Sequence, residues 1–450
     1  MSRTVSDMTH GSPTKLLIKF AIPLMLGNIF QQMYTMTDAA IVGQFAGAEA
    51  LGAVGSADWL CWLVFGVISG IMQGFSILVA QRFGAADYKS MRRSLSTSIV
   101  LAGIVVVLFT TVGIAAVNPL LRLMGTREEL FSQASGYLYV LYGGIAITAI
   151  YNLLASMLRA LGNGRAPLIA MVVASVTNIG LDLLFVIVFK WGVVGAAAAT
   201  VIAEVFASVI CFIAISKLDI LKFQKGEFVF DRADARTLIK LASPMGFQNI
   251  LICVGGMAVQ TVINGLGFAF VTGFTATNKL YGLMEAAAIS FGYAITTYTG
   301  QNLGAGKFDR IKDGMRKAAV IGLIASLILT GIIFLCGRFL LSLFIESSAD
   351  PEVMVVALRY LRTMAATLAS LYMLYVYRSA LQGMGDTVMP MVSGLVEGVM
   401  RVSAAWILTS MVGPNGIYYA ESAAWIGAAI LLAASYFYRV KKLERASLKA

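Results

Sequence analysis

The first hydrophobic segment of the chain is repeated about halfway along it. Lys15–Pro23 (KLLIKFAIP) recurs 221 residues later as Arg236–Pro244 (RTLIKLASP), and an Asn stands five residues after the Pro in both copies. At nearly the same spacing, Gln81–Ala85 (QRFGA) is matched by Gln301–Ala305 (QNLGA). Landmarks that keep one order and one spacing predict that the chain is a duplicated unit.

The composition places this duplicated unit in a lipid bilayer. Hydrophobic residues make up 59% of the chain and charged residues 13%, against about 25% charged in soluble domains. The charges avoid long apolar stretches, each able to cross about 30 Å of hydrocarbon as a helix. Long runs without alternation exclude the strands of a membrane barrel. Twelve helices are predicted, over residues 15–40, 50–79, 93–117, 134–157, 166–189, 194–215, 237–264, 269–298, 314–338, 354–380, 388–411 and 416–438.

The basic residues predict how the chain is oriented. If the N-terminus is cytoplasmic, most of the 34 Lys and Arg fall on the inner side, which is the usual bias of multi-pass proteins in the cell membrane. Both termini are therefore expected inside, with only Lys279 and Arg401 left within the membrane. The net charge of +11 then reflects topology and attraction to anionic membrane lipids. A nucleic-acid partner would need a basic soluble domain, and none is predicted.

Six helices per half is an even number, so both halves enter the membrane from the same side. This predicts two lobes related by a pseudo-two-fold axis along the membrane normal, as in transporters built from parallel repeats. The expected N-terminal lobe is 14–215 and the C-terminal lobe 237–438. A cytoplasmic linker, 216–236, joins them, and a basic tail follows at 439–450. We expect a monomer.

Several chemistries find no support in the sequence. The four cysteines stand singly in apolar stretches, and the only histidine, His10, is in the polar N-terminal segment. Neither pattern has the spacing of a metal or disulfide site. A Gly-rich phosphate loop that ends in Lys-Ser or Lys-Thr is also missing. The chain is therefore expected to be neither an enzyme nor a cofactor protein, and any ion coupling should run through carboxylates.

Polar residues inside the predicted membrane helices are the candidate functional residues, because such groups are costly there. On the first helix, Asn28, Gln31, Thr35 and Asp38 follow one another at spacings of 3, 4 and 3 residues. They therefore share one helix face. The first three are candidate cavity or substrate residues.

Asp38 has counterparts at a similar depth in two other helices. Asn178 and Asp182 stand four apart on the fifth helix, and Thr200 is on the sixth. Counted from the outer helix ends, Asp38, Asp182 and Thr200 lie roughly 6–11 Å deep. Carboxylate, amide and hydroxyl oxygens suit Na⁺, and two close carboxylates could equally hold a proton. The alternative is that Asp38 is interfacial and that Asn178 and Asp182 make a helix-packing hydrogen bond.

Other membrane charges are more ambiguous. Glu397 and Arg401 stand four apart and are expected to neutralise each other. Glu285 has no partner on its own helix, so it either faces a substrate cavity or forms a salt bridge to another helix. Glu204 lies one turn below Thr200 on the same face.

Several of these motifs together resemble the multidrug and toxic compound extrusion (MATE) family. The resemblance covers residues 14–438 and depends on the paired Pro-containing first helices, Asp38–Gly43, Gln81–Ala85 and Leu158–Gly162 through Pro167. It implies two six-helix lobes, a central cavity and export of amphipathic, often cationic compounds in exchange for Na⁺ or H⁺ by alternating access. In the DinF-like branch, the cation site of the N-terminal lobe falls on Asp38, Asn178, Asp182 and Thr200.

The resemblance also separates this chain from related branches and functions. The NorM-like branch uses acidic residues of the seventh and tenth helices, and 237–264 and 354–380 contain none. A lipid-linked oligosaccharide flippase of related architecture is the alternative function. Several Arg or Lys would be expected in its cavity, whereas only Lys279 and Arg401 are expected here within the membrane. An open channel fits a duplicated chain with a buried carboxylate pair less well than alternating access does.

Overall fold

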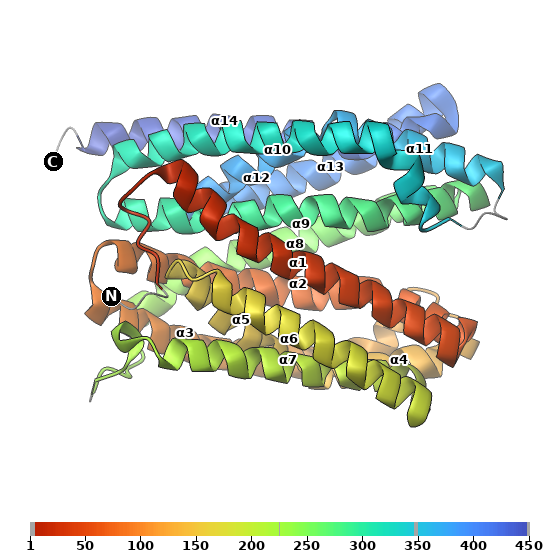
Figure 1. The fold of residues 1–450 in the computed structure, drawn as a ribbon, viewed down its shortest axis with the longest axis horizontal. Helices are drawn as coiled ribbons and strands as arrows, with labels where there is room; N and C mark the ends of the chain where they lie inside the picture. The colour runs from red at the N-terminus through yellow and green to blue at the C-terminus, as the bar shows by residue number, and fades with distance from the viewer. Residues whose placement is uncertain (1–4, 225, 346–349, 448–450) are drawn as a thin grey trace. The chain divides into compact units, whose positions relative to one another are not determined.

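A computed structural model describes residues 5–224, 226–345 and 350–447, and these are helical apart from short connections (Figure 1). The α-helices are α1 (Pro13–Ile41), α2 (Ala48–Gly84), α3 (Tyr88–Leu123), α4 (Glu128–Gly143), α5 (Ile145–Ala160), α6 (Arg165–Asp182), α7 (Gly192–Ser216), α8 (Arg232–Asn264), α9 (Phe268–Gly304), α10 (Phe308–Ser342), α11 (Pro351–Ala366), α12 (Leu368–Gly383), α13 (Val388–Val412) and α14 (Ala420–Ser447). Two π-helical segments, η1 (Val42–Ala46) and η2 (Leu183–Val188), and two 3₁₀ segments, η3 (Asp219–Leu221) and η4 (Gly413–Tyr419), complete the order. Residue 225 of the predicted linker and 448–450 of the predicted tail lie outside this description.

The helices correspond to the twelve predicted membrane stretches. Within the described ranges, eight helical runs are long and apolar enough to span a membrane, or ten if each of two bent pairs is one span. One of the eight, Val388–Arg445, contains both α13 and α14, which pack against each other and thus make two spans. The remaining predicted span is α9. It is long enough to span a membrane but is not among the eight, because Asn278, Lys279 and Glu285 lower its hydropathy.

Two predicted stretches, 134–157 and 354–380, are longer than expected and are broken. The first is α4 and α5, bent by 48°, and the second is α11 and α12, bent by 49°. The first break is at Gly144, where a Cβ would lie 2.5 Å from Val201 Cγ2. Glycine thus allows α7 to approach closely and weakens the helix at the same point. At the second break, the hydroxyl of Thr367 donates to the Thr363 carbonyl oxygen at 3.2 Å, and such back-bonding often bends helices.

The duplication seen in the sequence is repeated in the helix lengths. Helices α2 and α9 each have 37 residues, and α4, α5, α11 and α12 each have 16. Gly47 precedes α2 with φ 96° and Gly267 precedes α9 with φ 101°. Only glycine adopts that backbone region readily. The two halves thus fold into the same series of helices and breaks.

The described residues form two compact units. One contains the described residues up to 8 together with 22–246, and the other contains 9–21 together with those from 247 onward. The first unit is built on an extensive core of small and aliphatic side chains from α2 to α7. Many large apolar side chains remain exposed on these helices, including Val107 and Leu108 of α3. This pattern is typical of helices that face lipid.

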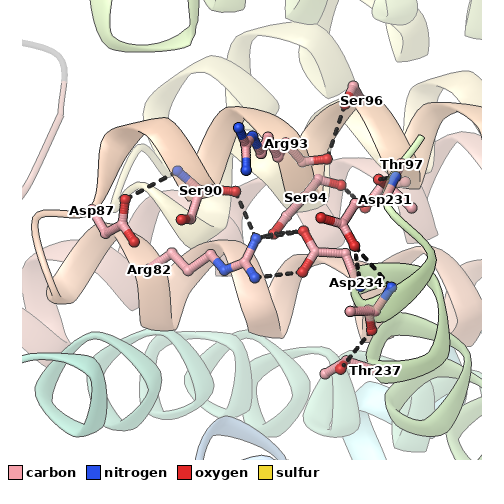
Figure 2. Close-up of polar contacts among 12 residues, drawn as sticks. Arg82, Asp87, Ser90, Arg93, Ser94, Ser96, Thr97, Asp231, Asp234 and Thr237 are labelled. Carbon is pink, nitrogen blue, oxygen red and sulfur yellow. Dashed lines mark hydrogen bonds and ion pairs between the residues drawn. The ribbon is translucent and has the colours of Figure 1, made fainter. Parts of the chain in front are cut away.

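The start of α8 and the residues before it are held against the end of α2 and the start of α3 (Figure 2). Arg82 binds the carboxylate of Asp234 as a bidentate ion pair, and Ser94 contacts the same carboxylate at 3.3 Å. Arg92 makes a second bidentate pair with Glu227, at 2.6 and 2.8 Å. Arg92 lowers the pKa of Glu227 to about 2. Because that pKa is lowered on folding, the pair stabilises the fold at neutral pH and loses its contribution as the pH falls toward 2.

Candidate functional site

The two predicted coupling carboxylates stand where α-helices change into π-helices. Asp182 is the last residue of α6, directly before η2, and Asp38 lies in the last turn of α1, before η1. Segments η1 and η2 pack on each other and on α7. The π-helix is rare and is found mostly at functional sites. The local backbone is thus irregular at the place where the sequence predicts ion binding.

Several side-chain oxygens at this place are buried and have no hydrogen-bond partner among the described residues. Asp182 and Asn178 are both 0% exposed. Asp38 Oδ1, Asn178 Oδ1 and both carboxylate oxygens of Asp182 have no hydrogen-bond partner among the described residues. Asp38 and Asp182 lie close enough for their charges to interact. Buried oxygens without a donor are costly, so this cluster is suited to receive a cation, a proton or water.

Thr200 completes the set from α7. The Asn178 amide nitrogen lies 3.4 Å from Thr200 Oγ1, and the Thr200 hydroxyl donates to the Ala196 carbonyl oxygen at 3.2 Å. The structure therefore brings Asn178 into contact with Thr200 and Asp38 within electrostatic range of Asp182. Over the described ranges, no group of three His, Cys, Asp or Glu side chains could hold a metal ion. The donor set is instead two carboxylates, an amide and a hydroxyl, which suits a hard monovalent cation.

Two further carboxylates extend the polar region of this unit. Asp58 of α2 lies within electrostatic range of Asp38; it was overlooked in the sequence, although an acidic residue in an apolar stretch was the signal. Glu204 of α7 accepts a hydrogen bond of 2.5 Å from Thr148 of α5. Tyr34 of α1 lies within range of both Asp38 and Glu204. The tyrosine thus connects the predicted coupling site with a carboxylate three turns into α7.

The three candidate cavity residues of α1 are partly or fully accessible. Gln31 and Thr35 are exposed and Asn28 is half-buried. The Thr35 hydroxyl donates to the Gln31 carbonyl oxygen at 3.0 Å, and the Gln31 side chain hydrogen-bonds Tyr34. The shared helix face therefore continues from Asp38 toward Asn28 as an accessible polar strip.

In the second unit, Glu285 is held by tyrosine. The Tyr375 hydroxyl of α12 donates to Glu285 Oε1 at 2.9 Å, and Tyr281 one turn earlier on α9 also hydrogen-bonds this carboxylate. In the described part of the chain, Glu285 makes no ion pair with Lys279 or Arg401. A salt bridge from Glu285 to another helix is therefore not observed among the described residues.

Glu397 and Arg401 form the predicted pair, but the pair belongs to a larger network. Glu397 accepts from Arg401 at 3.0 Å and from Arg378 of α12 at 2.7 Å, and Arg401 also binds Glu421 of α14 at 2.9 Å. Arg378, which the charge count assigned to the inner side, is also buried, at 5% exposed, because its ion-pair partner Glu397 comes from α13.

Comparison with known proteins now decides the family. The model of the MatE family matches the chain twice, over residues 23–184 and 244–407. The chain belongs to the MatE family. Because one model matches both halves, the predicted duplication is confirmed, and so is the resemblance noted from the sequence motifs.

The relatives and solved structures of this family cover nearly the whole chain. The "Probable multidrug resistance protein YpnP" of Bacillus subtilis (strain 168) is 27% identical over 412 residues, 91% of this chain and 92% of its own. The "DNA damage-inducible protein F" of Escherichia coli (strain K12) is 26% identical over 357 residues, 78% and 76% of the two chains. A solved MATE structure in complex with MaL6 superposes with a TM-score of 0.93 at 23% identity, covering 99% of this chain and 100% of its own. The all-α fold of twelve membrane helices is thereby confirmed, and MatE proteins are transporters, not enzymes.

Proposed function

We propose that this MatE protein is a secondary active multidrug exporter that exchanges amphipathic, often cationic molecules for Na⁺ or H⁺ by alternating access. The main observation that supports this proposal is the cluster of buried, unpartnered oxygens on Asp38, Asn178 and Asp182 beside Thr200. Relatives over most of the chain are named multidrug resistance or multidrug export proteins, which supports the substrate class.

The coupling step follows from the chemistry of this cluster. A cation or proton satisfies the buried carboxylate oxygens, and its departure leaves two like charges near each other in a poorly solvated place. The site with its ion bound and the site without it therefore favour different packing of α1 against α6 and α7. The backbone would change conformation at the π-helical segments η1 and η2. One charge moving inward down 100 mV releases about 2.3 kcal/mol, enough to drive uphill export of a neutral substrate.

Substrate contacts are proposed on the accessible polar groups of each unit. In the first unit these are Asn28, Gln31 and Thr35, with Glu204 as an additional acceptor for a cationic group. In the second unit, Glu285 is a carboxylate that has tyrosine donors and no ion-pair partner among the described residues. A cationic drug would supply the missing positive charge.

The DinF-like branch remains the assignment that fits the acidic residues. The predicted seventh and tenth stretches, 237–264 and 354–380, contain no Asp or Glu, so an acidic site of the NorM-like kind has no residues there. The flippase alternative is disfavoured by the ion pairs. Arg378 and Arg401 are neutralised by Glu397 and Glu421, so neither is available to bind pyrophosphate.

The proposed function predicts how transport depends on ion gradients. In liposomes, export of a cationic dye should follow an imposed Na⁺ or proton gradient, stop when an ionophore dissipates it, and proceed without ATP. Imposing the two gradients separately identifies the coupling ion. A strict requirement for ATP would contradict the proposal, as would dye movement that ignores both gradients.

The proposed location is the cell membrane, with both termini and the 216–236 segment cytoplasmic. A cysteine replacing Gln224 in a cysteine-free background should react with an impermeant maleimide only after the cells are opened, because the basic bias of the chain keeps this segment inside. Labelling in intact cells, with a cytosolic control protein unlabelled, would overturn this orientation.

A further inference from the structure

The described residues between α7 and α8 are fixed in place by their buried side. Leu218 and Leu221 are part of the core of the first unit, and Glu227 is paired with Arg92. The Ser96 hydroxyl donates to the Val229 carbonyl oxygen at 2.8 Å, and the Asp231 amide donates to Thr97 Oγ1 at 3.1 Å. The described residues 217–224 and 226–231 thus form a strap along the start of α3.

Outward from this strap, aromatic side chains are exposed. Phe228 is 58% exposed and Phe230 45%, with Val229 between them also exposed. Phe223 packs edge-on against Phe228 at a centroid distance of 5.4 Å. Three exposed phenyl rings in a connecting segment are unfavourable in water, so we expect this aromatic cluster to lie against an apolar surface.

The position of the strap along α3 indicates that this apolar surface is the hydrocarbon of the membrane. The exposed apolar face of α3 begins at Ile99 and Val100 and continues through Ile104 and Val107. Ser96, which holds Val229, is three residues before Ile99, or about 4.5 Å along the helix axis. Phe228 and Phe230 therefore lie within about one helical turn of the edge of the hydrocarbon, where apolar side chains of interfacial segments insert.

Positive charge lies beside the aromatic cluster. Lys89 and Arg93 stand one turn apart on α3 and are exposed; Lys89 is within electrostatic range of Glu227 and Arg93 of Asp231. The acidic groups near them are already engaged. Glu227 binds Arg92, and Asp231 accepts from two amides at the start of α8. Asp87 caps α3 by accepting from the Ser90 amide.

We propose that this strap is an anionic-phospholipid site. Phe223, Phe228 and Phe230 insert among the acyl chains, and Lys89 and Arg93 bind the headgroup phosphate. Arg92, Ser96 and Thr97 anchor the strap from behind.

Insertion of the strap is tested with tryptophan as a depth reporter. The full-length Phe228→Trp variant is placed in phosphatidylcholine/phosphatidylglycerol vesicles with or without bromine near the top of the acyl chains. After subtraction of wild-type fluorescence, the added tryptophan should be strongly quenched by bromine. Gln224→Trp, at an exposed polar position of the same strap, should be quenched much less. Phe230→Trp repeats the test at the neighbouring ring. Equal, weak quenching at 228, 230 and 224 would overturn insertion.

Headgroup binding is tested by mass spectrometry of the intact protein with retained lipid. Two basic residues near a membrane surface contribute about 1 kcal/mol each, so Lys89→Gln with Arg93→Gln should lower the preference for phosphatidylglycerol over phosphatidylcholine about thirty-fold. The control pair Lys441→Gln with Lys442→Gln removes the same charge from exposed positions on α14 and should leave the preference unchanged. An equal effect of both pairs would mean a general charge effect and would refute the site.

Discussion

Asp38→Asn is expected to abolish ion-coupled export while the protein remains folded. Asparagine keeps the size of the side chain and one oxygen acceptor, but it can neither carry a negative charge nor take up a proton. Because Asp182 is buried and lies within electrostatic range of the half-buried Asp38, removing one of two like charges should leave the melting temperature unchanged or raise it. Lost export with an unchanged or raised melting temperature would therefore reflect lost ion coupling and not a less stable fold.

The measurement is export of a cationic dye from liposomes under the gradient that drives the wild type, together with the melting temperature of the purified protein. Asp182→Asn should behave in nearly the same way. Asp309→Asn is the matched control, because that carboxylate is fully exposed at the start of α10, and it should transport normally. Wild-type export by either buried-site variant would remove Asp38 and Asp182 from the proposed coupling step.

The helices and the carboxylate set could be predicted because both depend on local spacing. Long apolar runs define membrane helices directly, and residues three or four apart necessarily share a face, which placed Asn178 with Asp182. Depth counted from the helix ends then selected Thr200 and Asp38. The structure places Asp38 with Asp182 and Asn178 with Thr200 by packing of α1, α6 and α7.

The remaining features depend on contacts between distant segments. The π-helical turns after Asp38 and Asp182 consist mostly of ordinary apolar residues, so no residue type marks them in the sequence. The bend at Gly144 depends on the close approach of Val201, 57 residues away in sequence. Ser96 and Thr97 gave no clear signal in the sequence, because their role of holding the strap before α8 depends on tertiary contacts.

The buried network of the second unit leads to the other large expected effect. Glu397→Gln should destabilise the protein by about 3 kcal/mol or more, because breaking a buried ion pair leaves a charge without compensation. Arg401 would keep Glu421, but Arg378 would retain only neutral partners such as Ser393 at 3.3 Å. The loss should affect every substrate alike, since it acts on folding.

Glu285→Gln is the matched comparison in the same unit. Glu285 is bound by tyrosine hydroxyls and pairs with no basic group among the described residues, so the glutamine variant should keep its melting temperature. If Glu285 binds cationic substrates, the variant should bind cationic drugs more weakly and neutral ones equally well. The two variants, followed by melting temperature and drug affinity together, therefore separate a structural carboxylate from a binding one.

An unchanged melting temperature for Glu397→Gln would show that water or another group compensates Arg378. A lowered melting temperature with unchanged affinity for Glu285→Gln would assign that carboxylate to the fold and leave substrate recognition to the first unit.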